Sequence, residues 1–150
     1  MDLILWRHAE AFDAAPGGTD LDRALTPHGL QQAQRMGAWL HQHLPRQTRV
    51  LVSPALRTQQ TAEALGRPFD TDPALLSGAS VQEVIEAVDW PQAKHPVLVV
   101  GHQPTLGMVA AWLMSGERQH WSVKKGGVWW LRSEHRHHAM LVTMRTPEHP

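Results

Sequence analysis

Four apolar residues run directly into two basic ones in the stretch Leu3-Ile4-Leu5-Trp6-Arg7-His8-Ala9-Glu10. The apolar run 3–6 is typical of a short buried strand, and the polar residues follow at the point where that strand ends. In open α/β sheets, ligands bind in the crevice outside the carboxyl ends of the strands. Arg7 and His8 therefore lie where functional groups are expected, although a strand followed by a solvated polar loop would give the same pattern.

Two later stretches have the same design. The apolar run 50–52 ends at Ser53-Pro54, which we expect to be the N-cap and the first position of a helix that reaches about residue 65, with Arg57 in its first turn. The apolar run 97–100 ends at Gly101-His102, ahead of a second apolar helix. Both stretches thus place a basic or ionisable side chain just beyond a predicted strand.

Parallel pairing of these strands would bring the side chains together. The carboxyl ends of neighbouring parallel strands lie at one edge of a sheet, beside helix N-termini that favour anions. Four basic or ionisable residues would then share one crevice: Arg7, His8, Arg57 and His102. The pattern predicts a phosphate pocket that contains a candidate nucleophile.

Three signatures in this order resemble one known family. They are Arg7-His8, then Ser53-Pro54-x-x-Arg57, then Gly101-His102. From residue 2 to about residue 144, the chain resembles the histidine phosphatase superfamily, also called the phosphoglycerate mutase-like superfamily. Its short length and the segment Arg23-Ala24-Leu25-Thr26-Pro27-x-Gly29 look most like the SixA-type phosphohistidine phosphatases. Those are compact proteins that remove phosphate from histidine on phosphotransfer domains.

The resemblance implies a single α/β domain over residues 1–150. The expected architecture is phosphoglycerate mutase-like, with three layers (α/β/α) and a central, mainly parallel sheet covered by helices on both faces. The runs 127–131 and 139–144 are expected to add an antiparallel hairpin at the C-terminal end. Since the chain has no insertion large enough to form the lid of the big mutases, we expect an open site.

Arg23 follows a loop and precedes a predicted helix. The loop 10–22 is rich in glycine, aspartate and alanine, and Thr26-Pro27 is typical of an N-cap and a first helical position. The composition alone would describe Arg23 as a surface arginine. The resemblance implies instead that Arg23 contributes to the phosphate pocket.

The expected chemistry centres on His8. A histidine attacks phosphorus only through an unprotonated ring nitrogen, so the adjacent Arg7 would help by lowering its pKa, and a backbone carbonyl or a carboxylate on the other ring N–H would fix the tautomer. Water would then hydrolyse the phospho-His8 intermediate. Four residues are expected to bind the phosphoryl oxygens: Arg7, Arg23, Arg57, and His102 as a charged donor. Because these groups supply the positive charge, the scheme needs no metal ion and no cofactor.

The proton donor for the leaving group is less clear from the sequence. Larger members of the superfamily place a glutamate after the second helix, but the corresponding segment 73–78 has no carboxylate. An alkoxide leaving group needs such an acid, whereas the imidazole of phosphohistidine leaves well once protonated. The absence therefore favours phosphohistidine as substrate, with Glu10 and Asp13 as the remaining candidate acids.

Three functions stay open at this point. The leading prediction is a metal-independent phosphatase that acts on the phosphohistidine of a phosphotransfer protein. A small phosphorylated metabolite is the alternative partner. The second is a small-molecule phosphomonoesterase that uses Glu10 or Asp13 as its acid. The third is a non-catalytic module that binds phosphate, against which the intact candidate nucleophile speaks.

Composition argues against several other classes. Lys plus Arg and Asp plus Glu are each 14, so the net charge is zero, and no basic run indicates a nucleic-acid partner. Cysteine is absent, which removes disulfides and thiolate catalysis. His135, His137 and His138 lack the spacing and the partners of a zinc site, so no metal site is predicted. Without a signal peptide or an apolar span of about 18 to 20 residues, we expect a cytoplasmic protein that does not bind membranes.

Overall fold

The computed structural model describes residues 1–135 and 138–150 of the chain. Its strands are β1 (Asp2–Arg7), β2 (Arg49–Val52), β3 (Asp70–Thr71), β4 (Val97–Gly101), β5 (Val128–Ser133) and β6 (Ala139–Arg145). Its α-helices are α1 (Pro27–His43), α2 (Leu56–Glu63), α3 (Val81–Ala87) and α4 (Thr105–Ser115), and its 3-10 helices are η1 (Asp20–Asp22) and η2 (Pro73–Leu75). Among these described residues, no helix is long and apolar enough to cross a lipid bilayer.

The strands form a sheet in the order β3-β2-β4-β1-β5-β6. β1 and β2 both pair in parallel with β4, and β3 pairs in parallel with β2. β5 runs antiparallel to β1, and β6 runs antiparallel to β5. The prediction of a mainly parallel sheet with an antiparallel C-terminal contribution is confirmed.

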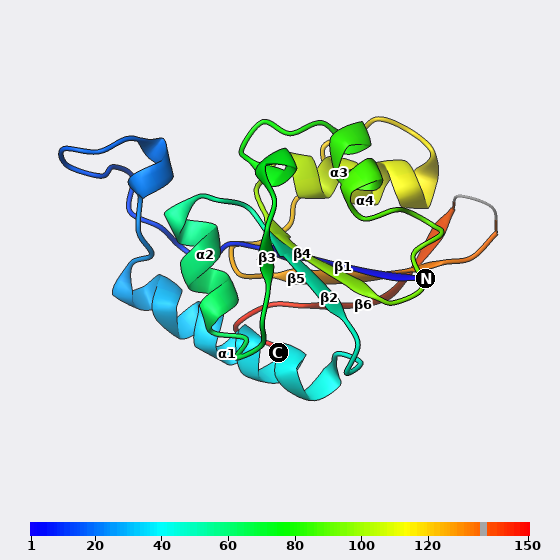
Figure 1. Cartoon of the computed structure of the whole chain (residues 1–150), viewed down its shortest axis with the longest axis horizontal. Helices are drawn as coiled ribbons and strands as arrows, with labels where there is room; N and C mark the ends of the chain where they lie inside the picture. Colours follow the sequence, from blue (N-terminus) through cyan, green and yellow to red (C-terminus); the bar gives the residue numbers. More distant parts are fainter. Residues whose placement is uncertain (136–137) are drawn as a thin grey trace.

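Helices cover both faces of this sheet, as Figure 1 shows. Leu3 and Leu5 of β1 pack with residues of α3 and α4, whereas Ile4 and Trp6 pack with residues of α1 and α2 on the opposite face. Successive side chains of a strand point to opposite faces, so a strand covered on both sides must be apolar at every position. This is why the run 3–6 is uninterrupted, and the predicted three-layer arrangement is confirmed.

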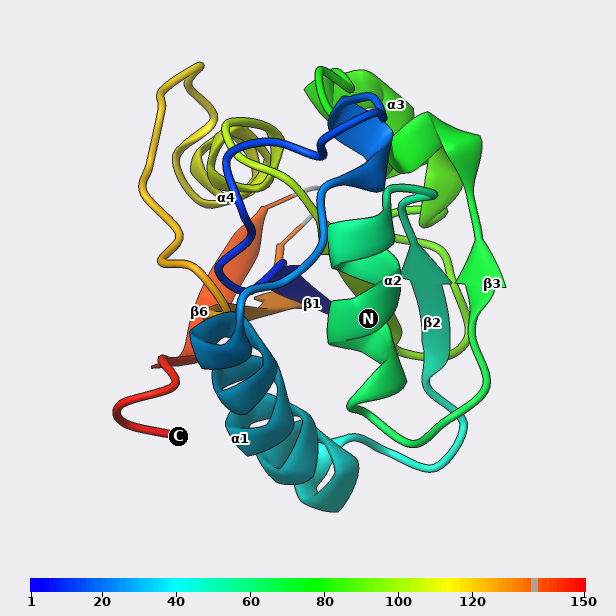
Figure 2. The same ribbon diagram turned by 90° about the vertical axis from the view of Figure 1, so that its left-hand side faces the viewer.

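The central strands end level with one another. Arg7 pairs with Gly101 where β1 and β4 end. The next residue, His8, donates its backbone N–H to the Gly101 carbonyl over 3.1 Å. Ser53 directly follows β2, and its backbone N–H donates to the Val100 carbonyl over 3.1 Å. The residues that follow three strands therefore emerge side by side at the edge of the sheet that faces the viewer in Figure 2.

The predicted start of α1 is confirmed, and other helices also have well-defined ends. The Thr26 hydroxyl accepts a hydrogen bond from the backbone N–H of Gly29 and caps α1. Ser80 and Glu83 form a capping box at the start of α3. Gly116 ends α4 with a left-handed backbone at φ 75°, a conformation that glycine adopts without steric penalty.

The start of α2 differs from the prediction. Ala55, and not Ser53, is the N-cap, and no side chain caps this helix. The Ser53 hydroxyl is bound instead to Nε2 of His102 over 2.8 Å, and the Ser53 carbonyl accepts a hydrogen bond from the Thr58 hydroxyl over 2.8 Å. The chain therefore turns before the helix begins, which still leaves Arg57 in the first turn.

Candidate active site

A polar cavity of about 230 Å³ lies at the edge where β1 and β4 end. Its walls come from the ends of these strands, from η1, from α2 and from the intervening loops. The lining residues are Arg7, His8, Ala11, Asp13, Asp20, Arg23, Arg57, Ser77, His102, Gln103 and Lys125. They include every candidate residue of the sequence analysis except Glu10.

His8 is held at both its backbone and its ring. Besides its N–H bond to β4, its carbonyl accepts a hydrogen bond from the backbone N–H of Gly126 over 3.1 Å. Its ring Nδ1 lies 2.7 Å from the carbonyl oxygen of Ala9. A carbonyl can only accept, so the proton must be on Nδ1, and Nε2 carries the lone pair. The tautomer-fixing group that the sequence left open is thus the Ala9 carbonyl.

The environment of His8 disfavours its charged form. The side chain is buried, with 8% of its surface exposed. The pKa of His8 is lowered to about 3, mainly by burial. The hydrogen bond to Ala9 opposes this effect, and the nearby His102, Arg57 and Arg7 add to it. At neutral pH the imidazole is therefore neutral and nucleophilic.

Ala9 connects the His8 segment to α2. Its backbone N–H donates to the Thr61 hydroxyl over 3.1 Å, and that hydroxyl donates to the Arg57 carbonyl over 2.7 Å. Ala9 has a negative φ, and its buried methyl packs with Leu25 and Ala33. The alanine at this position is thus accommodated without strain.

Two arginines place buried N–H groups beside His8. Arg57 is 3% exposed, and its Nε is buried without a partner among the described residues. Arg7 donates from Nη1 to the Val123 carbonyl over 3.0 Å, and its Nε is likewise buried without a partner in the described part of the chain. Buried donors without acceptors are unfavourable unless a ligand provides oxygen atoms. The two guanidinium groups are therefore suited to bind an anion.

His102 lies next to His8 and is also buried. The two ring centroids are 5.4 Å apart, and Nε2 of His102 is hydrogen-bonded to the Ser53 hydroxyl. Burial, followed by the charge of Arg57, lowers the pKa of His102 to about 4. The protein's own groups therefore favour the neutral ring at neutral pH, so a charged His102 donor remains a prediction for the complex with phosphate. A bound dianion would favour the charged ring.

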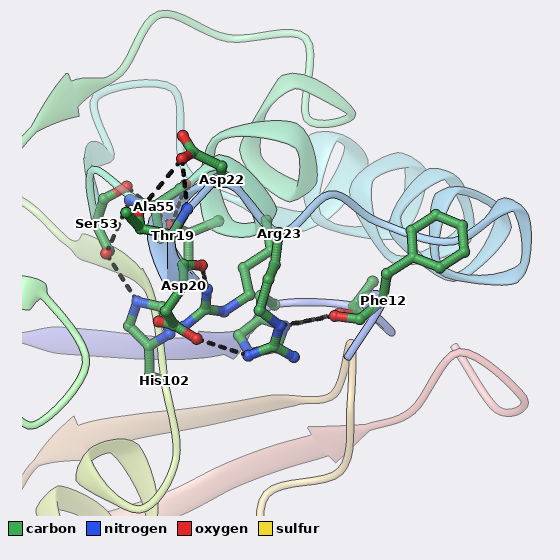
Figure 3. Close-up of polar contacts among 12 residues, drawn as sticks. Phe12, Thr19, Asp20, Asp22, Arg23, Ser53, Ala55 and His102 are labelled. Carbon is green, nitrogen blue, oxygen red and sulfur yellow. Dashed lines mark hydrogen bonds and ion pairs between the residues drawn. The ribbon is translucent and has the colours of Figure 1, made fainter. Parts of the chain in front are cut away.

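Arg23 reaches the cavity from the loop after η1. Its Nε donates to the Phe12 carbonyl over 2.7 Å, and its Nη1 donates to the Asp20 carboxylate over 2.9 Å. These contacts, drawn in Figure 3, hold the guanidinium beside the other arginines. The structure thus brings Arg23 together with the residues that follow the strands.

The two candidate acids differ in position. Asp13 lines the cavity. The Glu10 carboxylate does not, because its Oε2 accepts a hydrogen bond from the Thr26 hydroxyl over 2.6 Å at the start of α1. Glu10 therefore helps to anchor the loop to α1, and Asp13 is the candidate acid that remains.

Several polar residues at the site were not expected, and two of them bind candidate residues directly. Ser53 binds His102, and Asp20 binds both Arg23 and Arg57. Ser53 directly follows β2 and is 0% exposed. A polar residue at the carboxyl end of a buried strand is the sequence signal that could have revealed its role. Asp20 lies in a polar loop with several other acidic residues, so nothing in the sequence distinguishes it.

No group of three metal-ligating side chains is present among residues 1–135 and 138–150. His137, which the sequence analysis considered with His135 and His138, lies outside the described residues.

Comparisons with known proteins identify the family of the chain. The model of the histidine phosphatase superfamily (branch 1) matches residues 3–78. Phosphohistidine phosphatase SixA of Escherichia coli (strain K12) is 34% identical over 127 residues, which cover 78% of this chain and 76% of that protein. The structure of the protein histidine phosphatase SixA complexed with tungstate is similar with a TM-score of 0.84 and 26% identity, over 98% of this chain and 97% of that chain. The alpha-ribazole phosphatase from Shigella flexneri shares the fold, with a TM-score of 0.72 and 21% identity over 98% of this chain and 97% of that chain.

Proposed function

The chain belongs to the histidine phosphatase superfamily, in its SixA-type branch, and from this premise we propose that it removes the phosphoryl group from phosphohistidine on a phosphotransfer protein. The comparisons support a phosphatase of this superfamily, and the phosphohistidine substrate is our proposal. One observation carries it: the Ala9 carbonyl holds the proton of His8 on Nδ1, which leaves Nε2 free to attack in a cavity lined by arginines.

The first step transfers the phosphoryl group to the enzyme. Nε2 of His8 forms a bond to phosphorus while the phosphorus–nitrogen bond of the substrate breaks, and the departing imidazole takes up a proton. Asp13, which lines the cavity, is the candidate donor of that proton. In the second step, water attacks the phosphorus of phospho-His8 and the bond between phosphorus and Nε2 breaks, with its electron pair returning to Nε2. A proton of the water passes to the Asp13 carboxylate, so that inorganic phosphate is released and both the neutral His8 ring and the acid are restored.

The cationic groups stabilise both steps. The phosphoryl group spreads negative charge over its three equatorial oxygens, and positioned donors lower the barrier by binding them. The buried Nε–H groups of Arg7 and Arg57 have no other acceptor in the described part of the chain, which fits them for this role. Arg23 and His102 line the same cavity and complete the set. Because four protein groups bind the phosphoryl oxygens, the proposed reaction does not require a metal ion.

The choice of substrate rests on the leaving group. Segment 73–78 has no carboxylate, and the residue of this segment that lines the cavity is Ser77. With Glu10 bound to Thr26 and Asp20 paired with Arg23 and Arg57, Asp13 is the acidic side chain left among the described lining residues to protonate an alkoxide. The imidazole of phosphohistidine depends less on a general acid than an alkoxide does, so we propose phosphohistidine as the substrate in preference to a phosphate monoester. The presence of Asp13 in the cavity keeps a small-molecule phosphomonoesterase as the second candidate.

The proposal is tested by single-turnover release of phosphate from a phosphohistidine-bearing phosphotransfer domain in EDTA. The intact protein is compared with His8→Ala and with His28→Ala, which removes an exposed histidine of α1. Fast release by the intact protein and by His28→Ala, lost in His8→Ala, is the expected result. p-Nitrophenyl phosphate serves as the monoester control, and equal or faster turnover of it would favour the second candidate and disprove the first. Binding without turnover of either substrate would leave only a phosphate-binding module.

A further inference from the structure

We propose that Asp20 determines how tightly the pocket binds phosphate, because its carboxylate competes with the phosphoryl group for the same arginine N–H groups. The inference rests on the proposed function, since it assumes that Arg23 and Arg57 bind phosphate.

The contacts of Asp20 resemble those expected of a bound oxyanion. Its Oδ1 accepts from Nη1 of Arg23 over 2.9 Å, and its Oδ2 accepts from Nη2 of Arg57 over 3.0 Å. The Asp20 backbone carbonyl also accepts from Nη1 of Arg57 over 2.8 Å. Figure 3 shows the carboxylate between Arg23 and His102. One aspartate thus bridges two of the arginines that line the cavity.

Charge makes this contact both strong and replaceable. Hydrogen bonds from Arg23 and Arg57 lower the pKa of Asp20, so the carboxylate is ionised at neutral pH. It compensates the buried guanidinium of Arg57, whose charge would otherwise lie 3% exposed without a counter-ion. A phosphoryl dianion supplies the same compensation with more charge and more acceptor oxygens. Both anions cannot hold these N–H groups at once without repulsion.

The surrounding structure allows Asp20 to leave. Its side chain is 57% exposed, and it belongs to the three-residue helix η1, which has no buried residue. Movement of η1 would therefore disrupt no core packing. Arg57, by contrast, is fixed in the first turn of α2, where its carbonyl is bound to Thr61. When a phosphoryl group enters, the exposed Asp20 carboxylate is therefore the group that is displaced.

The proposed competition has a consequence for the reaction. Free phosphate has only the pocket contacts, so it must displace Asp20 without other compensation. A phosphorylated protein adds contacts outside the pocket. The cost of displacing Asp20 is the same for both ligands, but the substrate offsets it with these outer contacts and free phosphate does not, so the product is released more readily.

The experiment measures the dissociation constant of inorganic phosphate by calorimetry for the intact protein, Asp20→Asn and Asp20→Ala. Both Asp20 variants are expected to bind phosphate about tenfold more tightly, because each removes a like charge close to the ligand. Asp22→Asn is the matched control, since Asp22 lies in the same helix but accepts its hydrogen bonds from Thr19. It removes the same charge from the chain, and its dissociation constant is expected to stay within twofold of the intact protein's.

Thermal unfolding with and without phosphate accompanies these titrations. In the absence of phosphate, Asp20→Asn is expected to unfold at a lower temperature than the intact protein, because Arg57 has lost its counter-ion. Phosphate is then expected to raise the unfolding temperature of the variant more than that of the intact protein. Unchanged or weaker phosphate binding by both Asp20 variants would overturn the inference and show that Asp20 only positions the arginines. Tighter binding by the variants without phosphatase activity in any form would support the inference while the proposed function fails.

Discussion

Nδ1 of His8 lies 2.7 Å from the carbonyl oxygen of the very next residue, Ala9. The contact is local, and Ala9 is itself held to α2, because its N–H donates a hydrogen bond to the Thr61 hydroxyl. The orientation of the proposed nucleophile is therefore set by the packing of α2 against the end of β1, before any substrate binds.

The tautomer and the pKa of His8 can be observed directly. We expect long-range ¹H–¹⁵N spectra to show a proton on Nδ1 and a bare Nε2, and we expect the ring to remain neutral to about pH 4, because burial lowers its pKa to about 3. His8→Asn identifies the signals by their disappearance. A proton on Nε2, or a titration midpoint near the ordinary histidine value, would show that the ring is not prepared for attack.

The same shift predicts how stability depends on pH. Below the ordinary histidine pKa of 6.5, the unfolded chain binds a proton at His8 that the folded protein does not bind until about pH 3. Stability is therefore lost as the pH falls through this window. Between pH 7 and pH 5, the intact protein is expected to lose about 2 kcal/mol more than His8→Asn in the free energy of unfolding. Urea denaturation of both proteins at the two pH values measures this difference, and parallel pH profiles would contradict it.

Ser53→Ala tests whether the serine positions His102. Removal of the hydroxyl leaves the buried ring without its Nε2 partner, which is expected to cost about 1–3 kcal/mol in stability and to slow single turnover about tenfold. Ser115→Ala is the control, because Ser115 binds a carbonyl within α4. If Ser53→Ala turned over as fast as Ser115→Ala, Ser53 would not be needed to position His102.

Gly29→Ala probes the contact between α1 and the loop after His8. A Cβ at this position would collide with the Glu10 carbonyl oxygen. We expect overpacking to destabilise the protein by about 1–3 kcal/mol in urea titrations. The neighbouring exposed substitution His28→Ala is expected to change stability by less than about 0.5 kcal/mol. Equal stabilities of the two variants would mean that the loop moves aside freely.

Much of this molecule could be predicted from short sequence patterns. Four consecutive apolar residues predict strand β1, and Thr26-Pro27 predicts the start of α1. Both signals are local, because strand burial and helix capping depend on residues that are neighbours in the chain. The meeting of His8, Arg57 and His102 follows from the rule that parallel strands end at one edge. These features depend on local periodicity and on a general property of sheets.

Other features depend on the path of individual loops. Glu10 was a candidate acid because it follows His8, but its carboxylate is bound to Thr26, which only the folded loop reveals. Asp20 meets Arg57 because η1 folds back over the cavity, a path that no periodic pattern encodes. The neutral state of His102 follows from burial, which the sequence around it does not determine. Contacts between loops thus account for what the sequence left open.

The central claim is that His8 carries the phosphoryl group on Nε2, and a rapid-quench experiment tests it most directly. The protein is mixed with a ³²P-labelled phosphohistidine protein and quenched in alkaline detergent, which preserves phosphohistidine, and the labelled peptide is then identified. We predict that the label appears on the peptide containing His8, attached to Nε2, and disappears at the rate of phosphate release. Phosphate release without label on His8, or at the full rate in His8→Ala, would contradict the account.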